Sequence, residues 1–247
     1  VGYESGYDLT TGYNNTLIGH QAGDNLTTGY YNTYLGSDAG EAAQGNFREV
    51  AIGYFALGRS NGGQDNIAIG YVAGQFIQGN DGTNGTKNTI VGAYAGDSIT
   101  TGNNNTCIGY DAEPTGATAT NSVTLGNGSI STLRCNTTSI SSLSDERDKT
   151  EIIDLPIGLN FINSLKPRKF KWASRDGKQG KDGTYEAGFI AQEFQSVESS
   201  TSVDYLNLVL DDNPDKLETA PNKLLPVLVK AIQELSARVE ELESKSD

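Results

Sequence analysis

The sequence predicts a repetitive all-β shaft followed by an α+β domain that ends in a coiled-coil helix. Three observations support this fold class. A glycine-centred motif repeats through the first half, the second half mixes helical and strand patterns, and a heptad pattern of apolar residues closes the chain. We therefore expect the shaft over residues 1–128, a β linker over 129–143 and the α+β domain over 144–247.

In the repeat, an aliphatic residue precedes a glycine and an alanine follows three positions later, as in NTLIGHQAG and NTIVGAYAG. Successive glycines are 17 residues apart, except for one step of 22 residues. That longer step contains GNDGTNGTKN, which we expect to protrude as a loop. The central glycines are Gly2, Gly19, Gly36, Gly53, Gly70, Gly92, Gly109 and Gly126.

The composition of each repeat suits a narrow, stacked β-structure. We expect the aliphatic residue to fill the axis, the glycine to allow a bend or a close approach, and the alanine to fit where a neighbour crowds. At about 3.3 Å per extended residue, one repeat supplies about two short strands and their turns. A single repeat cannot bury its apolar side, so stacking or association with other chains is required. A β-roll and a triple β-helix both satisfy this requirement.

The second half has the pattern of a mixed domain. DLPIGLNFINSLKP predicts a short helix that starts near Asp154 and stops at Pro167. RKFKW predicts a strand, SRDGKQGKDGT a flexible loop, and YEAGFIAQEFQ a strand that passes into a helix. DYLNLVLDD predicts another strand, and SISTLRCNTTSISSL predicts one or two strands in the linker.

The chain closes with a predicted helix over about residues 222–244. Its apolar residues alternate by three and four, which is the a/d spacing of a coiled coil. About two and a half heptads are short for stable assembly alone, so this helix needs help from the domain before it. A role as a core helix of its own domain remains open for Leu225 and Leu228. The a/d residues are Leu225, Leu228, Ile232, Leu235, Val239 and Leu242.

Composition argues against several classes of function. With 31 acidic and 18 basic side chains the net charge is −13, which disfavours nucleic acid and anionic membrane surfaces as partners. No apolar run reaches membrane-spanning length, so we expect no membrane insertion. Cys107 and Cys135 lack metal spacing and His20 is the single histidine, so we expect no metal and no cofactor. The absence of methionine predicts that the chain is a fragment of a longer protein.

The hexapeptide SDERDK, residues 144–149, stands at the border between the two patterns. A serine hydroxyl is a good nucleophile only when a base removes its proton, and a lysine can be that base only when neutral. Burial or nearby positive charge must then lower the lysine pKa by several units from about 10.4. Spacing alone favours a simpler interpretation, in which Ser144 and Asp145 are N-caps of a short turn. The four charged residues between Ser144 and Lys149, which are Asp145, Glu146, Arg147 and Asp148, either influence Lys149 or pair with each other.

Over residues 1–128, the repeats resemble the head domains of trimeric adhesins and the shafts of phage tail fibres. The resemblance implies a trimeric β-roll or triple β-helix. Exposed tyrosine and aspartate side chains would then offer a surface for a host glycan or receptor, although solvated positions without a ligand explain them more simply. These residues are Tyr3, Tyr54, Tyr71, Tyr110 and Asp111.

Four blocks follow the repeats in order: SSLSDERDKTEI, GLNFINSLKPRKFKW, AGFIAQEF and LLPVLVKAIQEL. Together they resemble the C-terminal intramolecular chaperone of phage tailspikes and tail fibres, the self-cleaving S74 peptidase family, over residues 144–247. The resemblance implies that Ser144 and Lys149 form a catalytic dyad. It also implies that the scissile bond is Leu143–Ser144.

By this resemblance the chain is a homotrimeric tail-fibre or tailspike fragment of the virion. The chaperone domain would trimerise and fold the shaft after synthesis in the host cytoplasm, and a single autoproteolytic cut would then release it. One alternative is a non-cleaving structural or receptor-binding fibre tip. A glycosidase in the repeats is the weakest alternative, because no pair of carboxylates stands out from the repeat pattern.

Overall fold

The computed structural model describes residues 1–79, 84–136, 140–173, 183 and 185–246. The chain divides into two compact units, Val1–Ile130 and Ser131–Asp247. The loop expected at SRDGKQGKDGT lies outside the described residues except for Gly183, and part of the insertion GNDGTNGTKN also lies outside them.

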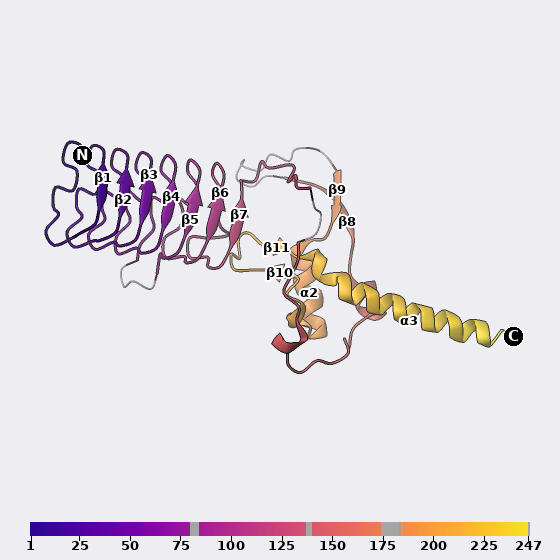
Figure 1. The fold of residues 1–247 in the computed structure, drawn as a ribbon. Helices are drawn as coiled ribbons and strands as arrows, with labels where there is room; N and C mark the ends of the chain where they lie inside the picture. Colours follow the sequence, from indigo (N-terminus) through magenta and orange to yellow (C-terminus); the bar gives the residue numbers. More distant parts are fainter. Residues whose placement is uncertain (80–83, 137–139, 174–182, 184, 247) are drawn as a thin grey trace. The chain divides into compact units, whose positions relative to one another are not determined.

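The first unit is a β-solenoid in which each repeat forms one rung (Figure 1). Each rung contributes one three-residue strand, which pairs in parallel and in register with the strands of the adjacent rungs. The predicted repetitive all-β shaft is confirmed. Because each strand pairs with strands of the same chain, the rungs form a roll rather than an interwoven helix. The strands are β1 (Thr16–Ile18), β2 (Thr33–Leu35), β3 (Val50–Ile52), β4 (Ile67–Ile69), β5 (Thr89–Val91), β6 (Thr106–Ile108) and β7 (Val123–Leu125).

Each rung has one strand rather than the two expected from its length. Most of its other residues form turns, and left-handed backbone recurs at equivalent positions, with φ 59° at Tyr31 and φ 57° at Arg48. Isolated parallel bridges, Tyr13 to Tyr30 and Tyr30 to Phe47, stand where a second strand was expected. The turns therefore take up most of the repeat length.

The aliphatic residue before each glycine points outward, so the expectation that it fills the axis is wrong. Ile18, Leu35 and Ile108 end their strands and are 42%, 43% and 43% exposed. The middle residues of the strands, such as Tyr34 and Cys107, are fully buried instead. Side chains alternate between the two faces of a strand. A three-residue strand of this solenoid therefore has a single inward side chain, the middle one.

The expectations for glycine and alanine are confirmed. Gly36 has φ +141°, and a Cβ placed on it would lie 2.4 Å from the carbonyl oxygen of Gly53 in the next rung. Only glycine fits so close a backbone approach. The alanines three positions after the glycines are fully buried. They are Ala22, Ala39, Ala56, Ala73, Ala95 and Ala112.

A row of asparagines just before the strands links successive rungs inside the solenoid. The Oδ1 of Asn32 accepts a hydrogen bond from the backbone N–H of Glu49 in the next rung (3.0 Å), and its Nδ2 donates to the carbonyl of Asn46 (2.7 Å). Asn88 makes the same pair of bonds, to the N–H of Asn105 and the carbonyl of Gly102. The side chains thus pair backbone groups that water cannot reach. The row is Asn15, Asn32, Glu49, Asn66, Asn88, Asn105 and Ser122.

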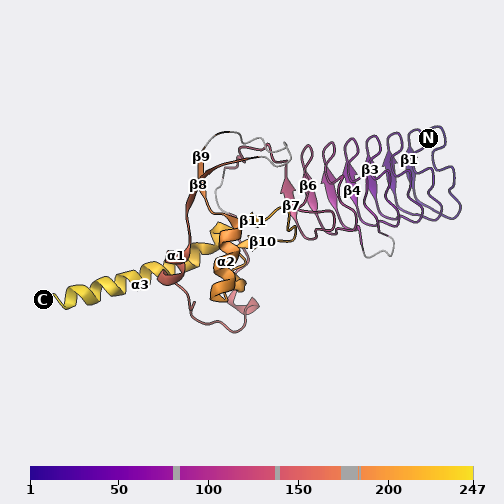
Figure 2. The same ribbon diagram turned by 180° about the vertical axis from the view of Figure 1, so that it is seen from behind.

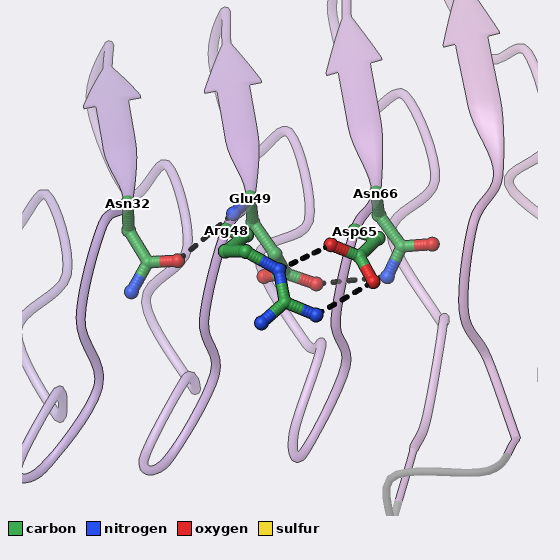
Figure 3. A network of polar contacts seen from close by, with 5 residues as sticks. All are labelled: Asn32, Arg48, Glu49, Asp65 and Asn66. Carbon is green, nitrogen blue, oxygen red and sulfur yellow. Dashed lines mark hydrogen bonds and ion pairs between the residues drawn. The ribbon is translucent and has the colours of Figure 1, made fainter.

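Glu49 replaces asparagine in this row and is fully buried (Figure 3). Its carboxylate accepts hydrogen bonds from the Nδ2 groups of Asn46 and Asn66 (2.8 Å each) and from the hydroxyl of Tyr34 (3.1 Å). Burial raises the pKa of Glu49, and these three hydrogen bonds oppose the rise. Asn46 also donates to the hydroxyl of Ser60 (3.1 Å). We call Tyr34, Asn46, Glu49 and Ser60 the Glu49 cluster.

The second unit is an α+β domain with a long terminal helix, as predicted (Figures 1 and 2). It contains two antiparallel strand pairs, β8–β9 and β10–β11. Phe161, Phe194, Leu208 and Val227 lie in its core. The elements are η1 (Glu146–Asp148), α1 (Leu159–Ser164), β8 (Arg168–Lys171), β9 (Tyr185–Gly188), α2 (Ala191–Thr201), η2 (Asp204–Leu206), β10 (Val209–Leu210), β11 (Glu218–Thr219), η3 (Pro221–Leu224) and α3 (Leu225–Ser244).

Three elements differ from the prediction. Helix α1 begins at Leu159 rather than near Asp154, and the carboxylate of Glu234 on α3 accepts a hydrogen bond from the Leu159 N–H (2.7 Å). Residues 204–212 form η2 and the short strand β10 instead of one longer strand. The described residues between 129 and 143 form no strand. The start of α1 thus depends on a contact from a distant helix rather than on a local cap.

Helix α3 packs on its own domain through a face other than its heptad row. Val227 and Ala231 are buried, whereas Leu225 and Ile232 are each 66% exposed and Leu228 is also exposed. The core-helix alternative for Leu225 and Leu228 is therefore wrong, and the a/d face of α3 is uncovered in the single chain. Within the described residues, no helix is both long and apolar enough to cross a membrane.

Candidate functional site

The turn at residues 144–149 is built around Asp145. This residue is the N-cap of η1, and its Oδ1 accepts a hydrogen bond from the backbone N–H of Arg147 (2.9 Å). The same carboxylate pairs with the Arg147 guanidinium through Nε (3.0 Å) and Nη2 (2.6 Å). This pairing lowers the pKa of Asp145 and raises the pKa of Arg147. Of the two capping residues expected, Asp145 is the cap, and its charge is matched by Arg147.

The turn brings the side chain of Lys149 onto Ser144. The Nζ of Lys149 lies 2.6 Å from the Oγ of Ser144 and 3.0 Å from its carbonyl oxygen. The backbone helps to hold Lys149, whose N–H donates to the carbonyl of Glu146 (3.1 Å). The Nζ to Oγ distance is within the range in which a base can take a proton from a hydroxyl. One short 3-10 turn thus joins the two residues that the resemblance selects.

The surroundings of this pair are open to solvent. Leu143, Ser144 and Lys149 are all exposed, and η1 has no buried residue. Exclusion of water strengthens electrostatic interactions and is one of the means by which proteins shift the pKa of a side chain. The single chain therefore provides the distance that serine activation needs, but it does not provide burial.

Three of the tyrosines that the repeats indicate, Tyr54, Tyr71 and Tyr110, lie in one row on the first unit. Tyr54, Tyr71, Tyr94 and Tyr110 follow one another with ring centroids 5.3, 5.2 and 6.0 Å apart, and all four are exposed. The repeat pattern does not indicate Tyr94, because this residue stands one position further from its glycine than the others. Tyr3 stacks on a histidine of the next rung instead. Among the described residues, no group of histidine, cysteine and acidic side chains could hold a metal ion.

Residues 144–203 match the family model Peptidase_S74, described as the chaperone of endosialidase. The second unit contains an S74 chaperone domain. The match begins at Ser144, so Ser144 and Lys149 both lie within the first six matched residues. No curated protein and no solved structure matches the chain.

Proposed function

We propose that the S74 domain of this chain trimerises and folds the β-solenoid shaft, and then releases itself by cutting the Leu143–Ser144 bond. An S74 chaperone domain attached to a β-helical shaft is typical of phage tail fibres. The observation that carries the autoproteolytic part is the 2.6 Å contact between Lys149 Nζ and Ser144 Oγ, at the first residue of the S74 match. The protein would then be a fibre or spike component of the virion.

The proposed chemistry is a single turnover on the chain's own backbone. Neutral Lys149 takes the proton of the Ser144 hydroxyl, and Oγ attacks the carbonyl carbon of Leu143. The C–N bond between the two residues breaks, and the protonated lysine gives its proton to the departing amine of Ser144. Water then hydrolyses the Leu143 ester, which leaves a carboxylate on Leu143 and restores the serine hydroxyl. No cofactor takes part in these steps.

Exposure of the site in the single chain supports an order of events in which assembly precedes cleavage. A lysine acts as a base only when it has lost its proton, and burial favours that form. Neighbouring chains that cover residues 143–149 would supply the burial. A chain that has not assembled would then keep its chaperone domain.

The uncovered a/d face of α3 supports trimerisation by the S74 domain. Pairing between long β-structures of separate chains is slow, because the contacts are distant in sequence. A C-terminal assembly of three chains raises the effective concentration of the shafts and makes their association intramolecular. This is the chaperone activity that we propose for residues 144–247.

The dyad is tested by Ser144→Ala and Lys149→Arg, with Ser142→Ala and Lys166→Arg as matched controls at exposed positions outside the site. We expect wild type and both controls to yield fragments 1–143 and 144–247 on a denaturing gel, with the cut placed by mass spectrometry. Ser144→Ala should remain intact, and so should Lys149→Arg, because arginine stays charged and cannot serve as the base. Cleavage of either site variant at Leu143–Ser144 would contradict the assignment of that residue.

The exposed tyrosine row favours a second candidate, a fibre tip that keeps its C-terminal domain and binds a host glycan or receptor. Exposed aromatic rings present apolar faces and, in tyrosine, a polar hydroxyl, which suits recognition of amphipathic ligands. The two candidates differ on the same gel. An assembled wild-type chain that stays intact would favour the tip.

A further inference from the structure

The outer face of the solenoid sheet has an unusual composition. It consists of the first and last residues of strands β1–β7, which flank the middle residue that is buried in β2–β6 and half-buried in β1 and β7. Every one of these positions holds threonine, valine, isoleucine or leucine. The last positions, aligned by the in-register pairing, are Ile18, Leu35, Ile52, Ile69, Val91, Ile108 and Leu125. We call both columns together the aliphatic face.

Charge is absent from the aliphatic face although the unit as a whole is acidic. Residues 1–130 contain eleven acidic and three basic side chains. A column two residues before the strands does carry charge, and there Arg48 pairs with Asp65 across two rungs (2.6 and 2.8 Å; Figure 3). The face is therefore uncharged along its whole length, with threonine at four of its fourteen positions, in a molecule that elsewhere displays charge. Exposed patches of this kind are often functional on protein surfaces.

We infer that the aliphatic face is the surface through which the shafts of neighbouring copies of this chain pack against one another. Two acidic shafts repel each other wherever their carboxylates meet, so the uncharged face is the side on which they approach at least cost. The residues of the face repeat along the shaft at the spacing of its strands. The same row on another copy has the same length and spacing, so it can cover every rung. This inference rests on the proposed trimer and names the surface that the shaft contributes to it.

The size of the face explains why the shaft needs a chaperone. Seven strands about 4.8 Å apart and three residues wide make a surface of about 30 by 10 Å, or roughly 300 Å². A stable protein interface needs about 800 Å² on each partner. The aliphatic face is therefore too small to hold separate shafts together, but it is sufficient once another part of the chain has brought them close.

Cross-linking between identical positions tests the inference. The full chain with Cys135→Ser carries Ile69→Cys or Ile108→Cys on the face, or Arg59→Cys as a control about half a repeat away on an exposed turn. The remaining Cys107 is buried, which raises the pKa of its thiol to about 11 and keeps it unreactive. A short bismaleimide is added to the native protein, sedimentation gives the oligomeric state, and a denaturing gel shows the linked chains.

We expect all three variants to sediment as trimers, with chains linked at positions 69 and 108 but not at 59. Trimers that link no better at positions 69 and 108 than at 59 would show that the shafts do not pack through the aliphatic face. The proposed trimer would not be affected by this result. Monomers in every variant would overturn both. Linking at position 69 alone would also contradict the inference, because a contact along the whole shaft must include both rungs.

Discussion

The two units of this chain bury their apolar residues in different ways. In the shaft, residues such as Ala51 and Ile90 are fully buried because each rung lies on the next, and the backbone itself makes the contact. In the C-terminal unit a small core around Phe194 holds short elements together, while much of α3 stays uncovered. In the shaft, stacking of the rungs thus buries the inward side chains within one chain, and the aliphatic face is a narrow surface at its side. The C-terminal unit leaves the a/d face of α3 uncovered.

This contrast predicts that assembly depends on the C-terminal unit. Replacing Ile232 and Leu235 with aspartate should abolish the trimer, because charges buried at an interface cost several kcal/mol each. Gln233→Asp with Ser236→Asp adds the same charge to exposed positions of the same helix and should leave the trimer intact. Sedimentation velocity measures both. If the first variant stayed trimeric, the heptad face would have no role in assembly.

A second comparison concerns how tightly the backbone is packed in each unit. Gly36→Ala should destabilise the shaft by about 3 kcal/mol or more, since its Cβ would meet the Gly53 carbonyl at 2.4 Å and φ is +141°. Gly183 also has a positive φ, +72°, but a Cβ placed there meets no atom within 4 Å. Gly183→Ala should therefore lower the free energy of unfolding by only about 1 kcal/mol. Guanidinium unfolding followed by circular dichroism gives both values. Equal losses would mean that the rung contact is not rigid.

The smallest expected effect is a difference in pH dependence. Glu113 stands where most other rungs have glycine, and its carboxylate accepts hydrogen bonds from the N–H groups of Asp97 (2.8 Å) and Ser98 (3.3 Å). Burial raises its pKa to about 7. Since this folded pKa lies above that of an unfolded glutamate, the shaft should be most stable below about pH 4.5 as far as this group is concerned. It should lose about 1 to 2 kcal/mol as the pH rises to 7, after allowance for solvent screening.

The C-terminal unit should respond to pH in the opposite sense. Arg168 pairs with Glu193 through its Nε (3.0 Å) and lowers the pKa of that carboxyl, so the contribution is present above about pH 4.5 and is lost as the pH falls. Glu113→Gln should flatten the pH dependence of shaft unfolding, and Glu193→Gln should flatten that of the C-terminal unit. Thermal unfolding between about pH 2 and 8 provides the measurement. A shaft that instead gains stability toward pH 7 would show that the hydrogen bonds to Glu113 outweigh its burial.

The sequence predicted features that recur at a fixed spacing better than features that depend on a single distant contact. The repeat identified the rungs and the buried alanines, because each is visible at every copy. It did not reveal that Ile18 faces outward, since a period of 17 marks equivalent positions without saying which face they occupy. The start of α1 was misplaced because Glu234, 75 residues away in sequence, provides its N-terminal acceptor. The closeness of Ser144 and Lys149 followed from the resemblance alone. The sequence left open whether the four charged residues between them act on Lys149 or pair with each other, and it did not single out the Asp145–Arg147 pair that shapes the turn.

The Glu49 cluster has a consequence for the order in which rungs stack. Rungs built from one motif are nearly interchangeable, so a chain could omit one rung and stack its neighbours directly. Each of the four residues of the cluster differs from its equivalents in the other rungs. At the positions of Tyr34 and Ser60 the other rungs have mostly alanine or another aliphatic residue. They have mostly glycine at the position of Asn46 and mostly asparagine at that of Glu49. If the rung of Glu49 looped out, the Tyr34 hydroxyl would lose the carboxylate that accepts its hydrogen bond and would be buried without that partner. The cluster therefore makes the complete stack of rungs more stable than a stack from which the rung of Glu49 is missing. It fixes the number of rungs in a shaft whose repeats are otherwise similar.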